Sequence, residues 1–192
     1  VAWRLAAGFA RCAPPSLDSI RCGGFNPDDE AMMQIASEAV AALPMVIEDR
    51  PLTVNGLCAL ARGEHARAPL SLVVVDYLHL LQPDAEDART REDQALRRAA
   101  YALKNLAKAL KCPVLALSQF NRVGAKSERP TMHDALGGSG IEQAADNVVI
   151  LVPDEGTEVR EPRNVRVRVR AHIDKRRGGP VCREGVMMLF NK

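Results

Sequence analysis

The chain has 192 residues, a length that fits one domain with a single sizeable core. Its 47% hydrophobic and 26% charged residues are typical of a globular protein and exclude a disordered chain. The net charge is only +2, so nucleic-acid binding would have to come from local patches rather than from an overall basic field.

Cysteine usage and hydropathy narrow the class further. The five cysteines are widely spaced and form no CxxC pair, so we expect neither a disulfide framework nor a zinc site. The same cysteine usage favours a protein of the reducing cytoplasm. No apolar run approaches the ~20 residues that span a bilayer, and the start has no signal-peptide layout, so no membrane partner is expected. Because the chain begins with Val1 rather than Met, inside a predicted helix, we expect it to be a piece of a longer protein.

The first elements in chain order are two helices separated by a short strand. Pro27 and the acidic residues behind it suit the start of a helix over 27–43. A proline ends that helix, and residues 45–49, MVIED, read as a short strand. Thr53 is a suitable N-cap for a second helix over about 54–66.

A buried strand and a long helix follow. Residues 70–76 are almost entirely apolar until Asp76 closes the run, which favours a strand. Residues 83–91, PDAEDARTR, form a polar loop. The helix over 92–111 is indicated by apolar residues at the spacing of one helical face, namely Leu96, Ala99, Ala100, Leu103, Leu106, Ala107 and Leu110.

Two further apolar segments predict strands over 114–118 and 147–152. The stretch between them, 121–140, is too polar and glycine-rich to be core. Continuous apolar strands that alternate with helices predict a mostly parallel sheet that is buried on both faces and flanked by helices.

The pattern changes to strict alternation over 165–174, VRVRVRAHID, which predicts a strand with one wet face. Residues 174–180 read as a turn and 186–190 as the returning strand of a C-terminal antiparallel hairpin. The basic residues of this strand, Arg166, Arg168 and Arg170, suit a nucleic-acid-binding patch. Charged side chains that keep an exposed sheet edge from pairing with another chain explain them at least as well.

Two of the predicted parallel strands end in polar residues, Asp76 and Ser118-Gln119. Ligands of open α/β sheets lie beyond the carboxyl ends of the strands. A carboxylate there can orient water on Mg²⁺, and a neighbouring amide can hydrogen-bond a terminal phosphate or an attacking water. Each residue alone is more often an ordinary turn or capping residue.

Four sequence blocks occur in the order LVVVDYLHLL, LKNLAKALKCPVLALSQFNR, GSGIEQAADNVVIL and IDKRRGGP. Together they resemble the ATPase domain of DnaB-type replicative DNA helicases, a branch of the RecA-like P-loop NTPase fold, over residues 27–190. The resemblance implies a hexameric ring that hydrolyses ATP with Mg²⁺, moves along single-stranded DNA and unwinds duplex during replication. It also implies a helicase loader and a primase as partners, in a bacterial or phage-infected cell near the nucleoid.

The resemblance assigns roles to single residues. Asp76 resembles the Walker B aspartate that holds Mg²⁺ through water, and Gln119 resembles the glutamine that senses the γ-phosphate. Lys175 and Arg177 resemble the lysine and arginine finger that reach the nucleotide site of the next subunit, where a fixed guanidinium offsets developing charge. Without the resemblance, KRR would read as a solvated basic turn.

The second central loop of the family resembles residues 134–143. Backbone N–H groups of Gly138, Ser139 and Gly140 are candidates for contacts with DNA phosphates. Leu136 and Gly137 stand where many members carry an arginine and a glutamate. Arg89 and Arg91 could add positive charge toward a DNA channel, and the acids around them fit an ordinary wet loop equally well.

The phosphate-loop motif GxxxxGK[ST] occurs nowhere in the 192 residues. We therefore expect a RecA-like fold without its first strand and P-loop, with incomplete burial of the sheet and weak triphosphate binding by the chain alone. Two alternatives stay open. One is a RecA-like remnant that does not hydrolyse ATP and serves assembly or DNA binding. The other is a recombinase or another RecA-like ATPase.

Overall fold

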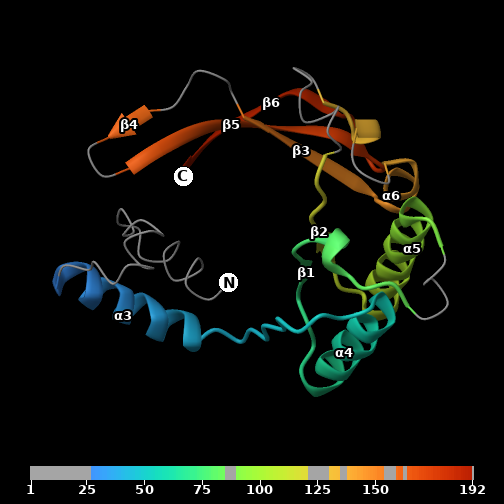
Figure 1. Cartoon of the computed structure of the whole chain (residues 1–192), viewed down its shortest axis with the longest axis horizontal. Coiled ribbons are helices and arrows are strands. Elements are labelled where there is room, and N and C mark those ends of the chain that lie inside the picture. The colour runs from blue at the N-terminus through green and yellow to red at the C-terminus, as the bar shows by residue number, and fades with distance from the viewer. Residues whose placement is uncertain are drawn as a thin grey trace. The chain divides into compact units, whose positions relative to one another are not determined.

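The computed structural model describes residues 27–84, 90–120, 130–134, 138–153, 159–161 and 164–191. The chain forms two compact units. The smaller comprises Val1–Glu48, Pro153–Arg168 and Leu189–Lys192, and the larger comprises Asp49–Val152 and Val169–Met188. The order of the elements along the chain can be followed by colour in Figure 1.

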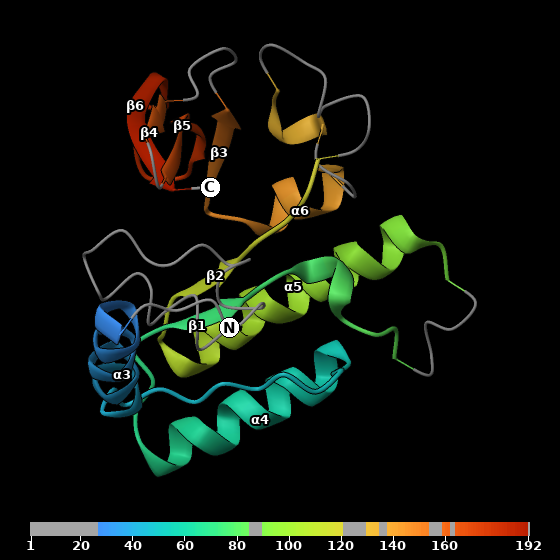
Figure 2. The same cartoon turned by 60° about the vertical axis from the view of Figure 1, so that its left-hand side comes forward.

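The larger unit begins with helix α4 (Val54–Arg67). Its N-cap is the predicted one, since the Gly56 amide donates to the hydroxyl oxygen of Thr53 at 3.1 Å. Helix α5 (Glu92–Leu110) lies beside α4 (Figure 2) and ends at Lys111, which adopts the left-handed conformation with φ 49°. The predicted helices over 54–66 and 92–111 are therefore confirmed.

Strands β1 (Val73–Val75) and β2 (Val114–Ala116) form a parallel pair in the register Val73–Val114, Val74–Leu115 and Val75–Ala116. Both are shorter than the apolar runs from which they were predicted. A 3-10 helix, η1 (Leu78–Leu80), follows β1 directly.

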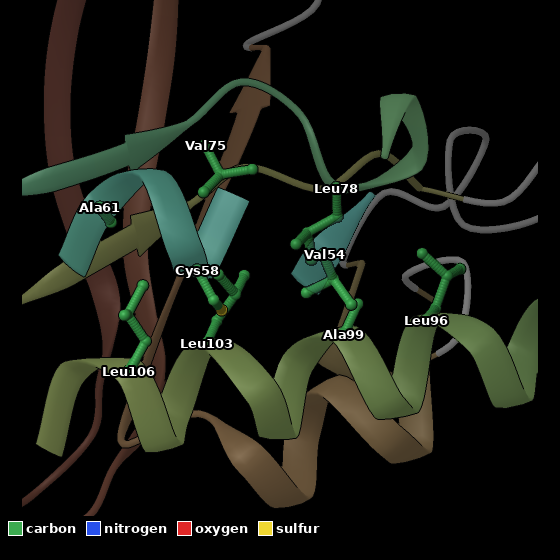
Figure 3. Close-up of a cluster of buried hydrophobic side chains, with 9 residues drawn as sticks. All are labelled: Val54, Cys58, Ala61, Val75, Leu78, Leu96, Ala99, Leu103 and Leu106. Atoms are coloured by element: carbon green, nitrogen blue, oxygen red, sulfur yellow. The ribbon is translucent and has the colours of Figure 1, made fainter. Parts of the chain in front are cut away.

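The main core lies where α4, α5, β1 and η1 meet, and Figure 3 shows the side chains of α5 pointing toward those of the other elements. Leu106 of α5 is completely buried. The spacing that predicted α5 also predicted this face, since five of its seven apolar positions are buried. The buried cluster consists of Val54, Cys58, Ala61, Val75, Leu78, Leu96, Ala99, Leu103 and Leu106.

The prediction that the strands are buried on both faces is wrong, and the expectation that burial of the sheet is incomplete is confirmed. Val74 and Leu115, which pair across β1 and β2, are each 54% exposed. Val149 and Leu151 of strand β3 (Asn147–Pro153) are exposed as well. For β1 and β2 the physical reason is that α4 and α5 pack against one face of the pair, which leaves Val74 and Leu115 on the other face uncovered.

Among the described residues, the second sheet has four strands, and these are the last four strands in chain order (Figure 1). Strand β5 (Asn164–Arg176) pairs with β3, with β4 (Val159–Glu161) and with β6 (Cys182–Asn191). The β5–β6 pairing confirms the predicted hairpin, although β5 runs past Asp174 to Arg176. Strand β4, which pairs with β5 in antiparallel fashion, was not predicted.

Two local predictions fail. Residues 45–49 form no strand, and the Met45 amide donates to the Leu43 oxygen in a tight turn after helix α3 (Pro27–Ala41). An apolar run becomes a strand only where a neighbouring strand can pair with it.

The second failure is an omission: no helix was predicted over 121–140, which contains the short 3-10 helix η4 (Met132–Asp134) and the start of helix α6 (Gly138–Ala144). Helix α6 packs against α5. This tertiary contact stabilises a helix that its glycines disfavour locally.

Candidate functional site

Asp76 and Gln119 lie at the same edge of the β1–β2 pair, beyond the carboxyl ends of the two strands. The pairing extends past the strands, because the Leu117 amide donates to the Val75 oxygen and the Leu78 amide donates to the Leu117 oxygen, both at 2.9 Å. Asp76 is thus opposite Leu117, and Gln119 follows two residues later. Both side chains are exposed and available to a ligand.

The segment that carries Asp76 is anchored on both sides by core residues. Val75 precedes it and Leu78 follows it, and both are buried in the main core. Helix α5 contacts η1 and β2, so this edge is supported by the longest described helix of the unit. An exposed carboxylate on a fixed backbone is what ligand orientation requires.

Lys175 and Arg177 lie together at the end of β5, near the junction of α6 and β3. Arg177 is in the predicted turn, and its amide donates to the Asp146 oxygen at 2.9 Å. Its guanidinium Nη1 is 2.9 Å from the carboxylate Oδ1 of the same Asp146. The Lys175 ammonium donates to the Glu142 carbonyl oxygen of α6.

The carboxylate of Asp146 joins two cations. Its Oδ2 accepts from the ammonium of Lys104 in α5, and its Oδ1 faces Arg177. The hydrogen bond from Lys104 lowers the pKa of Asp146 below its usual range, against a smaller opposing effect of burial. The charges of Lys104, Arg177 and Lys108 act in the same direction as the hydrogen bond.

The predicted DNA-contacting glycine segment forms the first turn of α6. Gly140 is buried against α5, and a Cβ added to it would lie 2.6 Å from the Cβ of Arg97. Close helix packing is therefore by itself a reason for glycine at this position. Leu136 and Gly137 lie outside the described residues.

The two predicted loop arginines differ in what the structure describes. Arg91 is the residue before α5, 79% exposed, and its guanidinium pairs with Asp93 at 3.2 Å. Part of its charge is thereby neutralised locally. Arg89 lies outside the described residues.

Sequence reasoning missed Lys104 and Asp146. Lys104 reads as one more charge on a helix, and Asp146 as a polar residue before a strand. The two are separated by 42 positions, and no spacing rule joins them. Among the described residues, no group of three or more histidine, cysteine, aspartate or glutamate side chains is arranged to hold a metal ion.

A family model described as DnaB-like helicase C terminal domain matches residues 9–192. The replicative DNA helicase DnaB of Geobacillus stearothermophilus is 31% identical over 176 residues, which cover 88% of this chain and 38% of that protein. The replicative DNA helicase DnaB of Mycobacterium intracellulare is 33% identical over 151 residues, covering 77% of this chain and 26% of that protein. The chain thus spans well under half the length of these relatives.

Two solved structures share the fold. One is an ATPase domain with a TM-score of 0.74 at 26% identity, over 98% of this chain and 65% of that one. The other, a DnaB-like replicative helicase studied with its interactions with primase, has a TM-score of 0.75 at 24% identity, over 98% of this chain and 44% of that one. The fold is therefore α/β and RecA-like. None of the described helices has the length and apolarity needed to cross a membrane.

Proposed function

The chain belongs to the DnaB-like helicase C-terminal domain family, and on this premise we propose that its full-length parent is an ATP-dependent replicative DNA helicase. The parent would assemble as a hexameric ring and couple ATP hydrolysis to movement along single-stranded DNA and to duplex unwinding. A helicase loader and primase are the further partners that this family implies. The names of both curated relatives support the replicative role.

The edge with Asp76 and Gln119 suits Mg²⁺ and a nucleoside triphosphate. Mg²⁺ keeps several waters and takes few protein ligands, so one exposed carboxylate at a strand end fits it. When bound, Mg²⁺-ATP supplies the phosphoryl group and the cation that offsets its charge. Asp76 would orient the metal's waters, and the Gln119 amide would hydrogen-bond the terminal phosphate or the attacking water.

Arg177 and Lys175 would act on the nucleotide of a neighbouring subunit. The Arg177 side chain is 58% exposed in a turn, and its contact with Asp146 engages one end of the guanidinium. A guanidinium has five N–H donors, so further donors remain to meet phosphate oxygens. A fixed positive charge at this point would stabilise the transition state more than the bound substrate.

The observation that carries this proposal is that Asp76 and Gln119 both lie beyond the carboxyl ends of β1 and β2, at the same sheet edge, in a chain of this family. The test is DNA-stimulated ATP hydrolysis by the full-length parent carrying Asp76→Asn, Gln119→Ala or Arg177→Ala. Each should lose most of its turnover, by about 10²-fold or more. The matched control is Glu64→Gln, which removes a carboxylate from another arginine pair on the surface of α4. Normal turnover in Asp76→Asn and Arg177→Ala would refute the assignment.

A second candidate, a RecA-like assembly or DNA-binding module that does not hydrolyse ATP, is favoured by the lack of GxxxxGK[ST] in these 192 residues. Leu136 and Gly137, in place of a charged pair, favour it too. The genomic sequence upstream of Val1 discriminates between the two candidates. A GxxxxGK[ST] motif shortly before Val1 would exclude the non-hydrolysing module, because the amides and lysine of that motif bind the phosphates of a nucleotide that is hydrolysed.

A further inference from the structure

We propose that Asp146 is a positioning residue that fixes the guanidinium of Arg177 in the orientation that meets a phosphate of the neighbouring subunit. This inference rests on the proposed role of Arg177 and deepens it. Asp146 touches neither nucleotide nor metal in this proposal, and it acts only through the arginine.

Arg177 is held by Asp146 at two points. The Arg177 amide donates to the Asp146 carbonyl oxygen at 2.9 Å, and guanidinium Nη1 lies 2.9 Å from the Asp146 carboxylate. The first contact places the backbone of the turn, and the second limits the rotamers of the side chain. Without the second, a side chain that is 58% exposed beside Gly178, which has open space around its Cα, would be free to sample many orientations.

Asp146 is in turn held by a rigid element. Its second carboxylate oxygen accepts from Lys104, whose side chain is only 18% exposed. Lys104 belongs to α5, and its neighbour Leu103 is buried in the main core. The chain of contacts therefore runs from the core through Lys104 and Asp146 to Arg177. Precise placement of a transition-state charge requires support of this kind.

The charges of the cluster are compatible with phosphate binding. Lys104 and Arg177 each carry one positive charge and Asp146 one negative charge, so the group keeps a net positive charge. The Asp146 side chain is 44% exposed and that of Arg177 58%, and a pair so open to water contributes little to stability. A positioning role therefore predicts that loss of the Asp146 carboxylate lowers kcat with little change in stability, whereas a purely structural role predicts that kcat falls only if stability falls.

The test uses the full-length parent with Asp146→Asn, which keeps the size of the side chain and removes its charge. We expect kcat for DNA-stimulated ATP hydrolysis to fall about tenfold, because a small displacement of a catalytic charge costs one to two orders of magnitude. The KM for ATP should change by less than about twofold, because the arginine acts on the transition state. Glu64→Gln, the matched carboxylate control, should retain the parent rate.

The decisive measurement repeats Asp146→Asn in the Arg177→Ala background, with single turnovers of labelled ATP to follow slow hydrolysis. If Asp146 acts through Arg177, the second substitution has no further effect. An equal loss in both backgrounds, or a parent-like kcat in Asp146→Asn when Arg177→Ala is inactive, overturns the inference. Normal turnover in Arg177→Ala overturns the proposed function instead, so the two failures are distinguishable.

Asp146→Glu keeps the test decisive if the asparagine variant does not fold. It retains the charge and moves the carboxylate by one methylene, so a positioning role predicts a partial loss of kcat in a protein that melts like the parent. Parent-like kcat in this variant, together with parent-like kcat in Lys104→Gln, would contradict a requirement for precise placement.

Discussion

Gly140→Ala tests the packing of α6 on α5. A Cβ added to Gly140 would lie 2.6 Å from the Arg97 Cβ, 2.8 Å from its Cγ and 3.0 Å from its Cα. Two of these atoms belong to or adjoin the backbone of α5, so rotation of the arginine side chain cannot relieve the overlap. The helices must move apart, which is the situation of an overpacked core.

The expected magnitude follows from a matched control. Gly63 is exposed in the interior of α4, and a Cβ added there meets nothing within 4 Å. Gly63→Ala should stabilise the protein by up to about 1 kcal/mol through helix propensity alone. Gly140→Ala gains a similar amount and loses about 1–3 kcal/mol to overpacking. The difference between the two variants, about 1–3 kcal/mol, therefore isolates the contact with Arg97.

The assay is urea unfolding of each variant, followed by circular dichroism and compared as the free energy of unfolding at equal m-values. Gly140→Ala should unfold at lower urea than the parent, and Gly63→Ala at higher urea. If both alanines shift the midpoint upward by the same amount, α5 and α6 do not approach as closely as described. The packing reason for glycine at position 140 would then be wrong.

The core and the ionic cluster lead to three more predictions. Leu106→Ala, at a completely buried position, should lower the free energy of unfolding by about 2–5 kcal/mol, measured by urea unfolding. Burial raises the pKa of the Cys58 thiol, so iodoacetamide should label Cys58 slowly in the native protein and rapidly in urea. Mass spectrometry measures the labelling, and fast labelling of the native protein would contradict the burial of Cys58. The pKa of Asp146 is lowered in the folded state, so the stability it contributes is present above its unfolded value of about 3.9 and is lost as pH falls through the lower folded value. The difference in stability between the parent and Asp146→Asn should therefore be constant near neutral pH and shrink only in acid.

Local sequence rules predicted those elements whose stability is local. The three-and-four spacing of α5 indicated both the helix and its buried face, and Thr53 indicated the start of α4. The same rules overestimated residues 45–49, an apolar run for which the described residues provide no strand partner. They also missed α6, whose glycines oppose a helix until α5 packs against it.

The candidate site likewise contains residues that local sequence rules could place and residues that only tertiary packing brings together. Asp76 and Gln119 could be placed from sequence, because parallel strands bring their carboxyl ends to one edge. The contact of Arg177 with Asp146, and that of Asp146 with Lys104, could not be placed from sequence, because these residues meet only after α5, α6 and β5 have packed. The alternation of residues 165–174 predicted a strand, and it carried no information about which carboxylate would face the turn that follows it.

Helix α5 connects the two halves of the candidate site. It packs against η1 and β2, which hold the edge with Asp76 and Gln119, and against α6, which leads to Asp146. It also contributes Lys104 to the carboxylate that holds Arg177. The groups proposed for a subunit's own nucleotide and those proposed for its neighbour's therefore share one support. Because packed cores transmit displacement rather than absorb it, a shift of α5 on nucleotide binding would also move Arg177, which is how such a helix would couple adjacent sites.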